Sequence, residues 1–266
     1  MKIWYQSTSS YRYEPVFDEY GKTLEEQCKR ILRPDTEVHV EGYEVMVRDI
    51  ENHKSLQYYQ NIQSLNNMLR AEREGYDAFV IGCTLDVGLE EGKAMLDIPV
   101  VGISETSYHL AMMLGHLFAV VTSSSAFFNV YKKQTERYGL SSKYLQGPYI
   151  CPASEEEIAT ALKNPGPLLE KFKVVAEKAI ADGASVIIPS PAFLTTLAYR
   201  AGLTKLQDAL VLDTISVAVK TAEMLADLKK IGIEPSRRIG VYAKPNKESR
   251  KKTLESFRKI FKIIED

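Results

Sequence analysis

Cysteine is scarce in this sequence, and its three copies lie far apart at Cys28, Cys83 and Cys151. An odd number of widely spaced cysteines argues against a disulfide framework and predicts a protein of a reducing compartment, the cytoplasm. None of the three belongs to a Cys-x-x-Cys motif, and the four histidines do not cluster with them. We therefore expect no structural zinc site.

An excess of charge and a long apolar run are also missing. The 34 Lys and Arg residues nearly balance the 35 Asp and Glu residues, for a formal net charge of -1. This balance gives no electrostatic reason to expect nucleic acid or a membrane as a partner. No apolar run approaches the roughly 18–20 residues of a membrane span. The N-terminal residues Met1–Tyr5 look like a strand rather than the start of a signal peptide.

Short apolar strands alternate with longer helical patterns along the chain. Fully apolar strands between helices are typical of a parallel sheet that is covered on both faces. The expected strands are Lys2–Tyr5, Glu37–Val47, Ala78–Ile81, Pro99–Ile103, Phe118–Thr122, Ser185–Ile188 and Ala209–Leu212. The expected helices are Leu24–Leu32, Leu56–Arg73, Leu89–Met95, Ser104–Leu114, Leu168–Ala181 and Ile215–Leu228.

A weak internal repeat suggests how these elements are grouped. The segment Gly75–Cys83 is echoed by Gly183–Pro191, and each copy follows a helix and precedes a further short strand. The repeat predicts an α/β fold of two pseudo-symmetric half-domains with mainly parallel sheets. A ligand would bind in the cleft between them, at the carboxyl ends of the strands.

The expected domain limits follow from this repeat. Residues 1–115 plus 216–245 would form the first half and residues 116–215 the second. The segment 246–266 would be a basic amphipathic helix, since Leu254, Phe257, Ile260, Phe261 and Ile264 recur at helical spacing among basic residues. We expect it to pack on the body or on a neighbouring subunit rather than on a membrane, and we expect a homo-oligomer.

The most reactive candidate residue is Cys83, which directly follows a buried strand. That position is the carboxyl end of the strand, where open α/β sheets bind their ligands. The helix that begins near Leu89 is expected to lower the pKa of the thiol, and a thiolate suits proton abstraction or nucleophilic attack. An isolated Gly-Cys-Thr would otherwise be read as a small buried side chain.

The stretch VIGCTLDVGLEEGKAMLDIPVVGISETSYHLAMMLGHLFAVVT, residues 80–122, resembles hydantoin and allantoin racemases of the aspartate/glutamate racemase superfamily. The resemblance continues at VAVKTAEML (Val217–Leu225) and RRIGVYAKP (Arg237–Pro245). It is weaker at MKIWYQSTSS, where the family has a strand followed by Asn-Pro-Asn-Thr or Asn-Pro-Asn-Ser. The family resemblance strengthens the functional interpretation of Cys83.

The resemblance implies a cofactor-free proton transfer at a carbon next to a carbonyl group. In the family two cysteines flank the substrate, one from each half, and Cys83 matches the first. The second would fall at Pro191, or at Ser190 with a shift of one residue, and neither is cysteine. Ser190 is thus the second candidate catalytic residue, although a serine hydroxyl is a poor base. Cys151 lies in an unmatched loop and is not expected to substitute.

Residues at the other strand ends are candidates for binding a small carboxylate, amide or hydantoin-like substrate. Thr84, Asp86, Thr122, Ser123 and Pro191 come from segments around the family motifs or the repeat, and Ser7 and Thr8 are candidates by position only. Each of the hydroxyl residues could instead be a helix cap or a turn residue.

The missing second cysteine leaves several reactions open. The first is a racemase or isomerase that uses Cys83 with a partner other than cysteine. A single-cysteine lyase, similar to arylmalonate decarboxylase, and an enzyme similar to maleate isomerase are alternatives. A hydrolase with Cys83 as nucleophile and a binding protein without catalysis complete the set.

Overall fold

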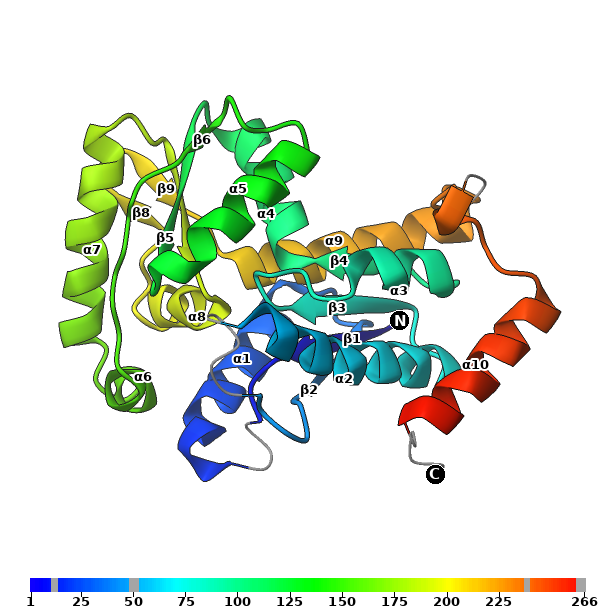
Figure 1. Cartoon of the computed structure of the whole chain (residues 1–266). Coiled ribbons are helices and arrows are strands. Elements are labelled where there is room, and N and C mark those ends of the chain that lie inside the picture. Colours follow the sequence, from blue (N-terminus) through cyan, green and yellow to red (C-terminus); the bar gives the residue numbers. More distant parts are fainter. Residues whose placement is uncertain (11–13, 48–52, 237–239, 262–266) are drawn as a thin grey trace.

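The computed structural model describes residues 1–10, 14–47, 53–236 and 240–261. Two separate parallel-sheet layers form the body, and helices cover both faces of each sheet (Figure 1). Within the described residues, no helix is both long enough and apolar enough to span a membrane.

The first sheet has the strand order β2-β1-β3-β4, and all its strands are parallel. The strands are β1 (Lys2–Ser7), β2 (Glu37–Glu41), β3 (Ala78–Gly82) and β4 (Val100–Gly102). Helices α1 (Asp18–Ile31) and α9 (Thr214–Lys230) cover one face, and α2 (Lys54–Arg73) and α3 (Leu89–Met95) cover the other. Every residue of β3 is buried, which is why this strand is apolar throughout.

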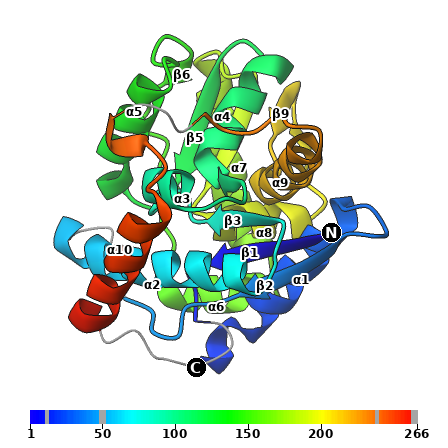
Figure 2. The same cartoon turned by 90° about the vertical axis from the view of Figure 1, so that its right-hand side faces the viewer.

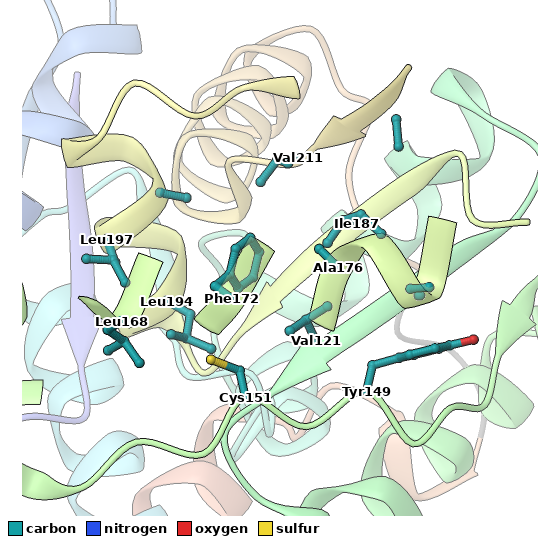
Figure 3. Close-up of a cluster of buried hydrophobic side chains, with 14 of the residues drawn as sticks. Val121, Tyr149, Cys151, Leu168, Phe172, Ala176, Ile187, Leu194, Leu197 and Val211 are labelled. Atoms are coloured by element: carbon teal, nitrogen blue, oxygen red, sulfur yellow. The ribbon is translucent and has the colours of Figure 1, made fainter. Parts of the chain in front are cut away.

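The second sheet has the strand order β6-β5-β7-β9-β8, with only β8 antiparallel to its neighbour. The strands are β5 (Phe118–Thr122), β6 (Tyr144–Leu145), β7 (Val186–Ser190), β8 (Lys205–Leu206) and β9 (Ala209–Val211). Helices α4 (Ile103–Leu114) and α5 (Phe128–Arg137) pack on one face. Helices α6 (Glu155–Ala161), α7 (Gly166–Ala181) and α8 (Ala192–Arg200) lie on the other, over the core drawn in Figure 3.

The chain passes from the first sheet to the second through α4 and returns through α9. Helix α9 packs against α1, α4 and the first sheet, so it belongs spatially to the first half. The α/β class with two mainly parallel half-domains, expected from the sequence, is confirmed. The residue limits of the two halves remain a prediction.

One difference from the predicted elements has a clear cause. The strand expected over Glu37–Val47 ends at Glu41. Beyond it, the Tyr43 N–H donates to the Ser9 carbonyl oxygen at 3.1 Å, and the Tyr43 hydroxyl bonds to Ser64, so the chain leaves the sheet. Helices α5, α6 and α8 and the short strands β6 and β8 were not predicted, and α5 carries two residues of the candidate site.

The C-terminal helix α10 (Lys247–Phe261) lies on the outside of the first half, beside the C-terminal end of α2 (Figure 2). Ion pairs attach it, because Arg250 contacts Glu72 and Asp97, and Lys244 contacts Asp97. The short helical turns Pro15–Phe17, Ser125–Phe127 and Gly240–Tyr242 complete the described elements. The side chains of Phe257, Ile260, Phe261 and Ile264 lie outside the described residues, so the amphipathic pattern of this segment stays a prediction.

Candidate active site

The two sheets meet at the carboxyl ends of their central strands. Ser7 at the end of β1 lies opposite Gly82 at the end of β3, and Thr122 at the end of β5 lies opposite Ser190 at the end of β7. The Ser190 Oγ atom donates a hydrogen bond to Thr84 Oγ1 at 3.0 Å. This bond joins the residue after Cys83 to the end of β7, so strand ends of both halves form one site.

Cys83 lies directly after β3 and is 8% exposed. Burial raises the pKa of its thiol to about 12, with a smaller contribution from the charge of Asp86. Hydrogen bonds from the Leu85 backbone and the Thr8 side chain oppose this shift without cancelling it. The expectation that the α3 N-terminus would lower the pKa is therefore wrong. Desolvation outweighs the available hydrogen bonds, and α3 begins only at Leu89.

A chain of hydroxyl groups surrounds Ser190 in the second half. The Tyr131 Oη atom lies 2.7 Å from Ser190 Oγ and 3.2 Å from Thr122 Oγ1. Burial raises the pKa of Tyr131 to about 12, whereas hydrogen bonds with Ser190, Thr122 and Thr84 lower it. All four side chains are at most 5% exposed. Their arrangement places a phenol at the end of the second sheet, on the side toward Thr84.

Helix α5 contributes a second residue that the sequence analysis missed. The Gln134 Nε2 atom donates to the Thr84 carbonyl oxygen at 3.0 Å, and Gln134 Oε1 accepts from the Tyr108 hydroxyl at 3.0 Å. Tyr131 and Gln134 stand three residues apart and thus on one face of the helix. The available signal in the sequence was the spacing of Tyr131, Gln134 and Thr135, which is typical of one face of a helix. These three residues are the buried ones in α5.

Asp86 holds the start of α4 behind Cys83. Its two carboxylate oxygens accept hydrogen bonds from the Ser104 N–H at 3.0 Å and the Glu105 N–H at 2.9 Å. Burial raises the pKa of Asp86 to about 7. A side chain at Gly102 would place its Cβ atom 2.6 Å from this carboxyl group, so the close approach requires glycine there. The carboxylate thus has partners within the protein.

The end of β1 carries hydroxyls of the first half. The Ser7 Oγ atom lies 2.9 Å from Ser9 Oγ, and Thr8 hydrogen-bonds with Cys83. Tyr20 on α1 lies beside them: burial raises its pKa, and hydrogen bonds with Ser7 and Thr196 lower it. Tyr20 therefore takes the place in the first half that Tyr131 takes in the second, because each phenol bonds to the last residue of the first strand in its half.

The remaining predicted residues have simpler surroundings. Ser123 follows β5 and is half-buried, and Pro191 is the residue before α8. Cys28 and Cys151 are fully buried in separate apolar cores, and Figure 3 shows the Cys151 sulfur among aliphatic and aromatic side chains. Neither thiol belongs to the hydroxyl cluster, which consists of Thr84, Thr122, Tyr131 and Ser190. Among the described residues, no three His, Cys, Asp or Glu side chains are grouped as metal ligands.

A cavity of about 1060 Å³ lies elsewhere, between α4 and α9. Its lining includes the exposed side chains Met113, Leu114 and Met224 but none of Cys83, Thr84, Thr122 or Ser190. This cavity is therefore separate from the candidate site. The candidate site is defined instead by the strand ends that the fold brings together.

Comparison with known proteins identifies the family of this chain. The model of the "Asp/Glu/Hydantoin racemase" family matches residues 18–222. A hydantoin racemase from Pseudomonas sp. (strain NS671) is 28% identical over 241 residues, covering 89% of this chain and 91% of that protein. A hydantoin racemase from Paenarthrobacter aurescens is 30% identical over 188 residues, covering 67% of this chain and 72% of that protein.

A solved structure shows the same architecture. The allantoin racemase from Klebsiella pneumoniae superposes with a TM-score of 0.73 at 25% identity, covering 93% of this chain and 94% of that one. The family match covers strands β2 to β9, including β3, the strand that leads into Cys83. The chain therefore belongs to the Asp/Glu/hydantoin racemase family.

Proposed function

We propose that this protein is a cofactor-independent racemase of hydantoin-type substrates, in which the Cys83 thiolate removes the proton from a carbon next to a carbonyl. One observation carries the proposal. The residue after Cys83 bonds directly to Ser190 at 3.0 Å, so the thiol is near the junction of the two halves, where a substrate can be flanked from both sides. Similarity to a hydantoin racemase over nearly the whole chain supports the substrate class.

The polar groups at the strand ends suit an uncharged cyclic amide. In the described part of the chain, the side chains that hydrogen-bond around Thr84 and Ser190 are hydroxyls and one carboxamide. Neutral donors can stabilise the enolate oxygen that forms when the carbon loses its proton. A carboxylate substrate would lose its hydration without gaining a cationic partner from this group, which favours a hydantoin over a free amino acid.

Optically pure 5-benzylhydantoin tests this function directly. The wild-type protein in D₂O should convert either enantiomer to the racemate and incorporate deuterium at C5, as followed by chiral chromatography and proton NMR. Cys83→Ala should lose this activity by at least a hundredfold, since general base catalysis contributes about that much or more. Cys28→Ala is the matched control, because its thiol lies in a separate core. Equal rates for Cys83→Ala and wild type would contradict the proposal.

A decarboxylase is the second candidate, favoured by one specific feature. The segment that corresponds to the second cysteine of the family reads Pro189, Ser190 and Pro191. With a single thiol, Cys83 could protonate one face of the enediolate that is left when a malonate-type acid loses carbon dioxide. Release of carbon dioxide from phenylmalonate, without racemisation of the hydantoin, would select this reaction.

A further inference from the structure

We propose that Tyr131, acting through Ser190, supplies the proton on the substrate face opposite Cys83. This inference rests on the proposed racemase function and names the group that stands in for a second cysteine. Ser190 is the group that would touch the substrate carbon. Tyr131 is a positioning residue that holds the Ser190 hydroxyl by a hydrogen bond. It passes its own proton to Ser190 after Ser190 has protonated the substrate.

The hydrogen bonds of the site define a direction for the proton. Ser190 gives its only hydroxyl hydrogen to Thr84, so its oxygen is free to accept from Tyr131 at 2.7 Å. Tyr131 in turn can accept from Thr122 at 3.2 Å. The order that uses each hydrogen once runs from Thr122 through Tyr131 and Ser190 toward Thr84, the neighbour of Cys83. A substrate between Cys83 and Ser190 would replace Thr84 as the acceptor.

The proton transfers balance without another reactant. The Cys83 thiolate takes the proton as the carbon–hydrogen bond breaks, and the electron pair moves to the carbonyl oxygen as an enolate. The enolate carbon then forms a bond to the Ser190 hydrogen on the other face, while the Tyr131 hydrogen passes to the Ser190 oxygen. Tyr131 is left as a phenolate within reach of three hydroxyls. Turnover of the opposite enantiomer, or exchange with water, restores the starting state.

Two further observations fit a pair of proton carriers. Burial raises the pKa of Cys83 to about 12 and that of Tyr131 to about 12. Both groups are thus weak acids that can hold the proton between turnovers. The first half has a matching arrangement, since Tyr20 bonds to Ser7 there as Tyr131 bonds to Thr122 in the second half. The fold thus places a phenol at the end of the first strand of each half.

The test separates inversion from exchange at the substrate carbon. Each enantiomer of 5-benzylhydantoin is incubated alone in D₂O with full-length protein. We expect Tyr131→Phe to lower inversion at least a hundredfold. For the enantiomer whose hydrogen faces Cys83, exchange with retention should persist within about tenfold. Tyr144→Phe is the matched control, since it removes a phenol oxygen from the same apolar cluster and should change neither rate.

A merely structural role for Tyr131 would lower inversion and exchange together, and that result would overturn the proposal, as would unchanged inversion. Thermal melting compared with Tyr144→Phe shows whether the variant is folded. Ser190→Cys added to Tyr131→Phe should regain inversion at least tenfold, because a thiol can carry the proton itself; failure of this rescue would remove Ser190 from the relay. A wild-type protein that neither inverts nor exchanges the hydantoin would overturn the proposed function, and this assignment with it.

Discussion

The hydroxyls of Ser190 and Thr84 lie 3.0 Å apart although the two residues are separated by 106 positions in the chain. Thr84 follows the Cys83 thiol at the end of β3, and Ser190 ends β7. This contact connects a reactive thiol of one sheet with the hydroxyl cluster of the other.

Alkylation should identify Cys83 as the thiol that substrate protects. Burial raises its pKa to about 12, so its thiolate fraction and its reaction with iodoacetamide should rise about tenfold per pH unit between pH 7 and 9. Cys28 and Cys151 are fully buried in apolar cores and should react more slowly in the folded protein. Mass spectrometry with and without 5-benzylhydantoin measures each site. A fast, ligand-protected Cys151 would show that the site is misassigned.

Removing the Thr122 hydroxyl should weaken catalysis without changing the fold. Thr122→Val deletes a hydrogen bond at 3.2 Å that lowers the pKa of Tyr131, so the phenol becomes a weaker acid. One hydrogen bond contributes about 1 kcal/mol, and we expect kcat to fall about five- to tenfold with little change in KM. Thr135→Val on α5 is the control, because its hydroxyl donates to the Lys132 carbonyl oxygen of the same helix. Equal kcat values for the two variants would contradict this role.

The carboxyl group of Asp86 should make stability depend on pH. Burial raises its pKa to about 7, above its usual value near 4, so the folded protein holds this proton between those pH values while the unfolded chain does not. The stabilisation is complete below pH 4 and is lost as the pH rises through 7. Urea denaturation should show wild type losing about 2–3 kcal/mol relative to Asp86→Asn between pH 5 and 8. Parallel pH profiles for both proteins would exclude this effect.

A methyl group at Gly82 should disturb the backbone that presents Cys83. The Cβ atom would lie 2.5–2.6 Å from ring and hydroxyl atoms of Tyr5, which is fully buried. Overpacking of this kind costs about 1–3 kcal/mol, so Gly82→Ala should lower both the free energy of unfolding and the turnover. Gly166→Ala serves as the control, because its nearest neighbour would lie 4.0 Å away. Equal stability of the two variants would contradict the predicted clash.

Much of the fold was determined by local sequence. The residues of β3 and β5 are all buried, and each strand is visible in the sequence as a short apolar run, which in β5 ends at Thr122. The position of Cys83 follows from the same feature, since the first residue after a parallel strand lies at the ligand-binding edge of the sheet. The family motif around residues 80–122 then indicated the chemistry.

Tertiary structure decided which groups surround that thiol. Tyr131 and Gln134 lie on a helix whose amphipathic pattern was not recognised, and nothing in their own segment indicates that they contact Ser190 and Thr84. The pKa of Cys83 also depended on packing. Its nearness to a helix in sequence predicted a lower value, but burial by residues distant in the chain raises it. Hydrogen bonds and desolvation depend on which groups are neighbours in space, whatever their separation in the sequence. The partners of Cys83 are therefore determined by the way the two sheets pack together.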